Sequence, residues 1–398
     1  MKKNVAIYGI GGLYNFGCEA ILRGTVKYIK KIYGDNTNII YYSRNIEDDS
    51  KITEQIDINI VDISRKNGVF KRIVSKAVDI LEIPIIPFFK REFNKIIDES
   101  DVIISVGGDI YTIPNYLRKN KKYRYVNYLV EFGEEALRKG KKVIIYGASI
   151  GPFGQYERAV NYYINHLKKI DQVICREMES VEYLKSHGVS ENVAFLPDPA
   201  FLVDKSNDKN LTNYVGINLS ELSLNEIYGK VTETEISVIC NLMEEIYEKT
   251  NLPLMLIPHV LSPHTPLDND YLFLKKIYGK LSADFKKNII LVKPKNFLDA
   301  KQYLKQCKFV IAARMHCAVN ASIEGIPTIF LTYSQKSKGM AQFIYGSENL
   351  CIPMQEIDKK LIFTVKELEK NYEKIRLNLE KRITEVEKNY NDYFDDFE

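Results

Sequence analysis

The chain has 398 residues, of which 45% are hydrophobic and 27% charged, proportions that are ordinary for a globular protein. Because single hydrophobic cores rarely grow beyond about 250–300 residues, this length favours two or more domains. With 56 basic and 52 acidic residues the net charge is +4, which excludes the strongly basic surface typical of nucleic-acid-binding proteins.

The cysteines and the apolar runs indicate an enzyme of the cytoplasm. Six cysteines are scattered along the chain without a C-x-x-C pair, a pattern that argues against a disulfide framework and a zinc site. No run of about 20 apolar residues occurs, so we expect no segment that spans a membrane. The short apolar run at residues 5–10 ends at Gly11 and Gly12, and it predicts a buried strand rather than a signal peptide.

The first half of the chain alternates short apolar runs with helical patterns. Strands are predicted at Val5–Tyr8, Asn38–Tyr42, Asp57–Ile63, Val102–Val106, Val143–Tyr146, Gln172–Arg176 and Val193–Leu196, and helices at Glu19–Tyr33 and Ser180–His187. This alternation predicts a mostly parallel sheet with helices on both faces. Ligands of such sheets bind at the carboxyl ends of the strands, where Gly, Ser and Asp residues follow several of these runs.

A polar stretch from Asp204 to Asn213 predicts a linker to a second set of strands. These are Tyr214–Leu219, Leu254–Pro258, Ile289–Leu291, Phe309–Ala312 and Thr328–Leu331. From about Asp358 to Tyr393, apolar residues recur every three or four positions, which predicts one long helix. We therefore expect two Rossmann-like, doubly wound α/β domains facing a cleft. The N-terminal domain covers residues 1–207, the C-terminal domain residues 208–353, and a helical segment residues 354–398.

The sharpest local motif is Arg314-Met-His316, which directly follows a predicted strand. An Arg and a His two positions apart at a strand-to-helix turn can both face a helix N-terminus, which itself favours anions. Lys336, after the next strand, can add a second positive charge. The alternative is a surface Arg beside a packed His. The Gly-x-Pro at 325–327 and the Tyr and Lys that follow it favour the anion site.

A Gly-rich turn at residues 8–20 matches neither the P-loop nor the dinucleotide-binding spacing. It puts Asn15 and Glu19 at the start of the first long helix. Glu19 is there either a general base or a favourable charge at a helix start, and we weigh the two roles equally.

Other polar residues also follow predicted strands. They are Gly107, Gly108, Asp109, Ser149, Arg176 and, in the second half, His259. Arg176 can bind an anion or can pair with Glu177 or Glu179 at a helix start. His259 is a candidate for contact with an acceptor substrate.

Residues 69–97 carry an apolar stripe with basic and aromatic residues between and after it. Such a segment can rest on an anionic membrane surface. Most stripes of this kind are buried core, which is the favoured interpretation here.

Taken together, these motifs resemble those of the polysaccharide pyruvyl transferase family over roughly residues 4–345. The resemblance rests on the Gly-Gly-x-x-Asn-x-Gly-x-Glu-Ala start, Gly107-Gly-Asp109, Gly147-Ala-Ser-Ile-Gly-Pro152, Arg176 with Ser180, Asp198-Pro-Ala-Phe201, and Arg314-x-His316 with Gly-x-Pro and Tyr…Lys after it. It implies a fold similar to the GT-B glycosyltransferases. It also implies transfer of a pyruvyl group from phosphoenolpyruvate to a pair of sugar hydroxyls as a ketal, in the biosynthesis of a cell-surface or capsular polysaccharide.

The resemblance also implies roles for individual residues. Arg176, Arg314 and His316 are expected to bind the phosphate and carboxylate of the donor, with His316 as the acid or phosphate partner. The family usually has an acidic residue just before the Glu of the first motif, where this chain has Cys18. If that acid is the catalytic base, this protein uses Glu19 or another carboxylate. No metal and no cofactor beyond phosphoenolpyruvate as donor are expected, and the acceptor is a saccharide, free or lipid-linked.

Two other functions fit the same fold. A GT-B nucleotide-sugar glycosyltransferase needs a carboxylate near the strand ends of the second domain, and Glu324 is the candidate. A non-catalytic member of a polysaccharide assembly complex is suggested by Cys18, which departs from the family's acidic residue. The sequence indicates cytoplasmic location, at most peripheral at the inner face of the membrane, without indicating an oligomeric state.

Overall fold

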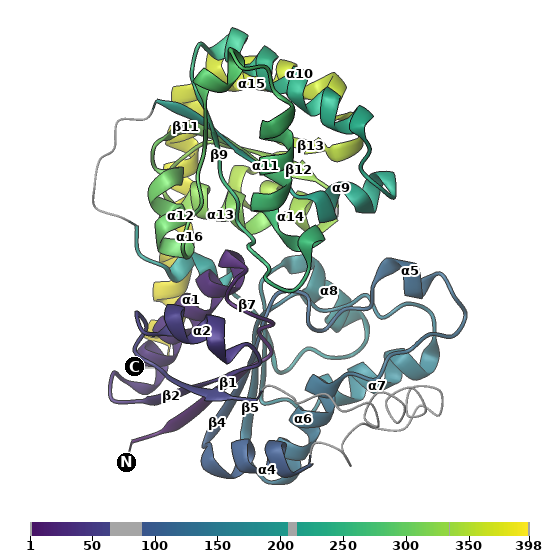
Figure 1. The fold of residues 1–398 in the computed structure, drawn as a ribbon. Helices are drawn as coiled ribbons and strands as arrows, with labels where there is room; N and C mark the ends of the chain where they lie inside the picture. The colour runs from purple at the N-terminus through teal and green to yellow at the C-terminus, as the bar shows by residue number, and fades with distance from the viewer. Residues whose placement is uncertain (1, 64–89, 206–212, 334, 397–398) are drawn as a thin grey trace. The chain divides into compact units, whose positions relative to one another are not determined.

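The computed structural model describes residues 2–63, 90–205, 213–333 and 335–396 (Figure 1). The chain forms two compact units, each with one β-sheet in which all paired strands run parallel. The first unit comprises Met1–Leu13, Ile21–Leu202 and Tyr390–Glu398, and the second comprises Tyr14–Ala20 and Val203–Asn389. The prediction of two parallel-sheet α/β domains with a helical C-terminus is therefore confirmed.

The first unit contains a seven-stranded sheet in the order β3-β2-β1-β4-β5-β6-β7. Its strands are β1 (Asn4–Tyr8), β2 (Asn38–Ser43), β3 (Asn59–Asp62), β4 (Val102–Val106), β5 (Lys142–Ala148), β6 (Gln172–Cys175) and β7 (Val193–Phe195). Its helices are α1 (Phe16–Tyr33), α2 (Ile46–Thr53), α4 (Lys90–Glu99), α5 (Asn115–Arg118), α6 (Tyr128–Arg138), α7 (Glu157–Leu167), α8 (Met178–Ser186) and the 3-10 turn η2 (Pro199–Leu202). The strand order reverses between β1 and β4, as in doubly wound sheets that bind ligands at that point.

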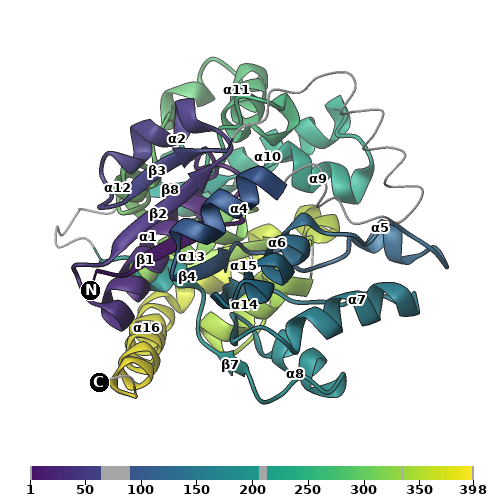
Figure 2. The ribbon, with the colours of Figure 1, turned by 90° about the horizontal axis from the view of Figure 1, so that it is seen from below.

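Helices cover both faces of the first sheet. On one face, apolar side chains of α4, α6, α7 and α8 form one buried cluster with those of the central strands, and Figure 2 shows α4 and α6 lying across β1 and β4. On the other face, Tyr28 of α1 stacks on Tyr146 of β5, with ring centroids 4.1 Å apart. Tyr146 also donates a hydrogen bond to Tyr390. The last residues of the chain thus form part of the core of the first unit.

The second unit contains a six-stranded sheet in the order β10-β9-β8-β11-β12-β13. Its strands are β8 (Tyr214–Asn218), β9 (Leu254–Leu256), β10 (Ile289–Leu291), β11 (Cys307–Ala312), β12 (Thr328–Thr332) and β13 (Cys351–Pro353). Its helices are α9 (Glu221–Tyr228), α10 (Glu233–Thr250), α11 (Asp270–Lys280), α12 (Phe297–Leu304), α13 (Met315–Ile323), α14 (Gln335–Tyr345), α15 (Ile357–Lys370) and α16 (Tyr372–Asp395), with 3-10 turns η3 (Pro266–Asp268), η4 (Phe285–Asn288) and η5 (Met354–Glu356). Helices α10 and α15 lie on one face of this sheet and α12 and α13 on the other (Figure 1).

A short segment near the N-terminus belongs to the second unit rather than to the first. Tyr14–Ala20 belongs to the second unit because Asn15 forms an antiparallel bridge with Val260 and the Phe16 N–H donates to the His259 carbonyl. Helix α1 accordingly begins at Phe16, three residues before its predicted start. The predicted domain boundary near residue 208 lies outside the described residues.

The C-terminal region is not one long helix as predicted. It forms α15 and α16, which are separated at Asn371. The Asn371 side-chain amide donates to the Glu367 carbonyl, a local side-chain bond that competes with regular helix hydrogen bonding. Helix α16 then contributes residues to both units, since the second unit ends at Asn389.

Only part of the segment considered for membrane contact can be described. Residues 64–89 lie outside the described residues. In α4, Phe93, Ile96 and Ile97 are buried in the core cluster of the first unit, and the Phe93 ring packs edge-on against Phe132. The apolar face of α4 is therefore core. Among the described helices, none has the length and apolar character that crossing a membrane requires.

Candidate active site

Arg314 is the centre of a polar cluster at the strand ends of the second unit. It is the N-cap residue of α13, directly after β11, and its backbone N–H donates to Asn218 Oδ1 at the end of β8 (2.9 Å). Its guanidinium donates to Asp270 Oδ1 through Nε and Nη2 (3.1 and 2.9 Å) and to Asp268 Oδ1 through Nη2 (2.6 Å). Burial alone would lower the pKa of Arg314, but the carboxylates of Asp270 and Asp268 outweigh it and raise this pKa. The guanidinium is therefore a fixed, permanent cation.

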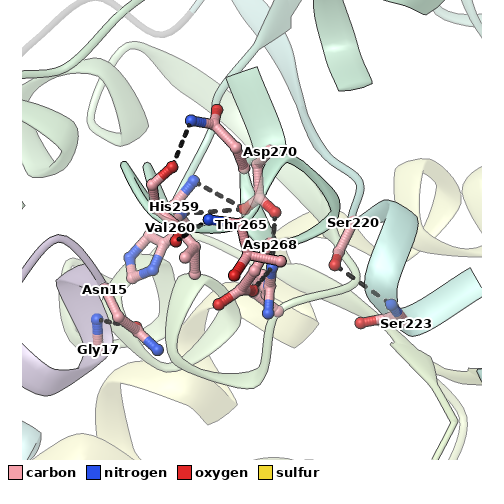
Figure 3. Close-up of polar contacts among 12 residues, drawn as sticks. Asn15, Gly17, Ser220, Ser223, His259, Val260, Thr265, Asp268 and Asp270 are labelled. Atoms are coloured by element: carbon pink, nitrogen blue, oxygen red, sulfur yellow. Dashed lines mark hydrogen bonds and ion pairs between the residues drawn. The ribbon is translucent and has the colours of Figure 1, made fainter. Parts of the chain in front are cut away.

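Asp270 holds this cluster together, with only 1% of its surface exposed. Its Oδ2 accepts hydrogen bonds from the backbone N–H groups of His259 and Val260 (both 3.0 Å) and from Asn218 Nδ2 (3.3 Å). Figure 3 shows Asp270 beside Asp268, with its hydrogen bonds reaching the His259–Val260 backbone. One carboxylate thus sets the positions of both the arginine and the histidine. Sequence reasoning missed Asp268 and Asp270, which lie 44 or more positions from Arg314.

His259, predicted on the acceptor side, is buried next to the arginine cluster. Its Nε2 lies 2.8 Å from Asn320 Nδ2, and Asn320 is four residues after His316, on the same side of α13. Burial, His316 and Arg314 hold the pKa of His259 well below its usual range, so the ring is neutral at pH 7. Within the described residues its Nδ1 has no hydrogen-bond partner. The ring also packs edge-on against Phe16, with centroids 5.6 Å apart.

His316 is half-buried and packs against the Gly-rich start of α1. A Cβ atom on Gly17 would lie 2.6 Å from His316 Cγ, a distance that no real Cβ contact allows. Asn15 Oδ1 accepts a hydrogen bond from the Gly17 N–H (3.0 Å), an Asx-type turn that starts the helix. Asn15 and Gly17 lie next to His259 in Figure 3. The first motif therefore requires glycine at this position because the backbone lies directly on the histidine ring.

The remaining predicted residues of the second unit lie at neighbouring positions. Lys336 is in the first turn of α14, which follows β12, and β12 pairs with β11. Glu19 is fully buried, and its Oε2 accepts a hydrogen bond from the Phe297 N–H at the start of α12 (2.7 Å). Of the two roles weighed for Glu19, this geometry favours the structural one, because a base must reach a substrate hydroxyl.

A second cluster forms at the strand ends of the first unit around Arg176. The guanidinium donates to Ser149 Oγ (3.0 Å), Asp198 Oδ2 (2.7 Å) and Asp109 Oδ1 (3.1 Å). Burial would lower the pKa of Arg176, but Asp198, Asp109 and Glu177 outweigh it and raise this pKa. The structure thus brings together residues that follow β4, β5 and β6 in the sequence.

Two glycines and a buried aspartate shape this second cluster. A Cβ on Gly108 would lie 2.8 Å from Arg176 Nη2, so the guanidinium packs on bare backbone. Gly107, next to it, has a φ of +150°, which favours glycine. Asp198 Oδ1 accepts a hydrogen bond from the Ala200 N–H (2.9 Å), and Asp198 has no exposed surface. Asp198 entered the sequence analysis in a family motif without a role, and the structure shows it as the buried partner of Arg176.

Comparison with known proteins settles the family. The sequence profile described as "Polysaccharide pyruvyl transferase" matches residues 15–335, which include both clusters. The chain belongs to this family. It is also similar to the amylovoran biosynthesis protein AmsJ of Erwinia amylovora, with 24% identity over 314 residues that cover 73% of this chain and 70% of AmsJ. As a polysaccharide pyruvyl transferase family member, the chain is thus related to a protein of amylovoran biosynthesis.

Solved structures with the same fold cover nearly the whole chain. HepE of Anabaena, solved with UDP and glucose, has a TM-score of 0.58 at 11% identity and covers 98% of this chain and 95% of its own. The UDP-GlcNAc 2-epimerase of Methanocaldococcus jannaschii has a TM-score of 0.57 at 14% identity, with 92% of each chain covered. At such low identity these neighbours establish the fold alone.

Proposed function

We propose that this protein transfers a pyruvyl group from phosphoenolpyruvate to two hydroxyls of a saccharide, forming a ketal during polysaccharide biosynthesis. The observation that carries the proposal is the family match across residues 15–335, which include Arg314-x-His316 at the uncapped N-terminus of α13. That helix end favours anions through its N–H groups and dipole. The relation to AmsJ supports a saccharide as the acceptor.

Donor binding is assigned to the second unit. Arg314 Nη1 makes no hydrogen bond within the described residues, so this arm of a fixed guanidinium can donate to a donor carboxylate or phosphate. Lys336, in the first turn of α14, adds a positive charge at the end of the neighbouring strand β12. We assign His316 as the acid, because it is half-buried and positioned by Gly17.

The reaction then proceeds with balanced protons. An acid delivers a proton to the methylene carbon of phosphoenolpyruvate, and the first hydroxyl forms a C–O bond to the adjacent carbon while losing its proton to a base. The C–O bond to phosphate breaks, and the phosphate leaves with the electron pair. The second hydroxyl forms the second C–O bond and loses its proton, so that phosphoenolpyruvate and diol yield ketal and hydrogen phosphate. No cofactor is needed, because the donor supplies both the pyruvyl group and the leaving group.

The place of reaction follows from the donor. Phosphoenolpyruvate is an intermediate of cytoplasmic metabolism, so we place the protein in the cytoplasm. A lipid-linked acceptor would be reached at the inner face of the membrane.

The alternative of a nucleotide-sugar glycosyltransferase has less support. Its candidate carboxylate, Glu324, forms a buried ion pair with Lys301 (2.7 Å), and neither side chain is more than 4% exposed. Since breaking a buried pair by removing one partner is costly, Glu324 is a structural residue. Thermal-shift measurements with uridine and guanosine diphosphates against phosphoenolpyruvate separate the two functions.

The proposal is tested by incubating the protein with phosphoenolpyruvate and a panel of free and lipid-linked saccharides. Phosphate release and a pyruvyl mass increment on the saccharide are measured together. Both should fall by at least about 100-fold in His316→Ala and Arg314→Ala, because loss of an acid or of an electrostatic contact typically has effects of this size. Phosphate release that is unchanged in both variants would refute the site. Donor binding without turnover would instead favour a non-catalytic assembly role.

A further inference from the structure

A basic loop follows strand β4 of the first unit. Residues 110–130 contain no Asp or Glu but five basic residues, Arg118, Lys119, Lys121, Lys122 and Arg124. The whole chain is nearly balanced, with 56 basic and 52 acidic residues, so this stretch departs clearly from the rest. A run of charges of one sign creates a local positive potential, which attracts anionic partners.

The base of this loop is fixed within the first unit. Asn127 Nδ2 donates to the Ile110 carbonyl (2.9 Å), a bond that joins the two ends of the loop. Tyr123 is buried, and its hydroxyl donates to the Phe153 carbonyl and accepts from the Tyr156 N–H (3.3 Å). The loop is therefore held at both ends and at Tyr123, so that its tip has a defined place on the unit.

The tip of the loop is exposed and positively charged. Helix α5 and the turn after it project from the first unit in Figures 1 and 2. Tyr116 in α5 is 70% exposed, the largest fraction among the large hydrophobic side chains of the described residues. Residues 119–122 are all exposed, and three of them are lysines. Over the part of the chain that the structure describes, neither Arg118 nor these lysines form an ion pair, so their charges are available to an external anion.

The chemistry of the tip fits an anionic membrane surface. Lysines reach lipid phosphates through long apolar stems, and each one near an anionic leaflet strengthens binding. Tyrosine is amphipathic and is enriched at the level of the headgroups. The exposed Tyr116 ring favours a membrane over an acidic protein, because the headgroup layer accepts such a ring without a preformed pocket.

We propose that residues 114–124 dock the protein onto a bilayer that contains anionic phospholipids. Tyr116 lies at the level of the headgroups, and Lys119, Lys121 and Lys122 contact the lipid phosphates. This surface lies outside residues 69–97, the segment considered for membrane contact from the sequence. The inference goes beyond the proposed reaction and does not depend on it, because lipid binding requires neither donor nor acceptor.

The test is co-sedimentation of the full-length protein with vesicles of phosphatidylcholine, either pure or mixed with phosphatidylglycerol. The partition coefficient is measured for the wild type and for a loop variant that combines Lys119→Gln, Lys121→Gln and Lys122→Gln. A matched control variant combines Lys95→Gln, Lys142→Gln and Lys185→Gln. The control lysines are also exposed and lie on α4, β5 and α8 of the same unit, so both variants lose three positive charges.

We expect the wild type to bind the anionic vesicles but not the neutral ones, and to be released as the salt concentration rises. A lysine near an anionic membrane contributes about fivefold to the partition coefficient. The loop variant should therefore bind the anionic vesicles about 100-fold more weakly, while the control variant stays within about threefold of the wild type.

A fluorescent probe tests the position of the tip itself. The chain contains no tryptophan, so Tyr116→Trp supplies the only one. Its emission should move to shorter wavelength with anionic vesicles and be quenched by brominated lipid, because indole enters the membrane interface. Phe363→Trp is the control, since Phe363 is 67% exposed on α15, and it should show neither change.

Several results would overturn the inference. Wild-type protein that binds neither kind of vesicle, or both equally, excludes docking directed by charge. A loop variant that binds as well as the wild type, or a control variant that binds as weakly as the loop variant, excludes this loop as the docking surface. Protein that ignores vesicles but binds polyglutamate through the loop has an acidic protein as its partner instead. None of these results bears on ketal formation, which is measured separately.

Discussion

Asp270 offers the most direct test of how the Arg314 cluster is built. Its two oxygens accept five hydrogen bonds, two from Arg314 and three from His259, Val260 and Asn218. In Asp270→Asn only one side-chain oxygen remains to accept hydrogen bonds. The new NH2 group must therefore face either the Arg314 guanidinium or the N–H groups that Asp270 Oδ2 now accepts from, and donors would then face donors. A buried charge that loses its partner costs about 3–5 kcal/mol, and an unpaired buried donor about 1–3 kcal/mol. Because Asp268 still pairs with Arg314, we expect a loss of about 3 kcal/mol in the free energy of unfolding.

The assay is equilibrium unfolding in urea, followed by far-UV circular dichroism. Asp268→Asn is the matched control, since its side chain is 27% exposed and its one bond to Arg314 spans 2.6 Å. We expect it to lose about 1 kcal/mol or less, as for exposed ion pairs. If Asp270→Asn is no less stable than Asp268→Asn, Asp270 does not organise the cluster as described.

Three further predictions concern packing and pH. Gly17→Ala should lower stability by about 1–3 kcal/mol and lower kcat, because its Cβ overlaps the His316 ring, whereas Gly11→Ala, with nothing within 4 Å, should leave unfolding and kinetics unchanged. His259 is neutral in the folded protein and becomes protonated in the unfolded chain below about pH 6.5. This group should therefore lower the wild-type free energy of unfolding by up to about 1.4 kcal/mol for each pH unit of acidification. Urea titrations at several pH values should give a shallower fall for His259→Gln, and equal slopes would contradict the burial of His259 as a neutral ring. Tyr390→Phe removes a buried hydroxyl that donates to a backbone carbonyl at 2.6 Å, and thermal unfolding should reveal a loss of about 1–3 kcal/mol, with no loss meaning that this end of α16 is not anchored by that bond.

Most strands could be predicted because parallel strands buried on both faces appear in the sequence as continuous apolar runs. Val102–Val106 and Ile289–Leu291 were predicted with the bounds that the structure has. The strand Cys351–Pro353 was missed, since three residues with a terminal proline give too short a pattern. The break at Asn371 was also missed, because the apolar period continues across it and Asn371 keeps backbone hydrogen bonds to Glu367 and from Ile375.

The candidate site was only partly predictable for a different reason. Glycines and polar residues after strands mark a ligand-binding edge whatever their partners are, so Arg176 and Arg314 could be identified from local sequence. Their counter-ions could not, because Asp198 and Asp270 lie 22 and 44 positions away and each looks like an ordinary turn or helix-start residue. The burial of Glu19 depends on contact with Phe297, 278 positions further on.

The central claim is that the three-carbon unit of phosphoenolpyruvate becomes part of a saccharide. The most direct measurement uses phosphoenolpyruvate labelled with carbon-13 at its central carbon and follows the label by NMR with a hydroxyl-bearing acceptor. We predict that the label appears as a quaternary ketal carbon attached to the sugar, in amounts equal to the phosphate released. Label recovered entirely as free pyruvate, or as unchanged donor with every acceptor, would contradict the account.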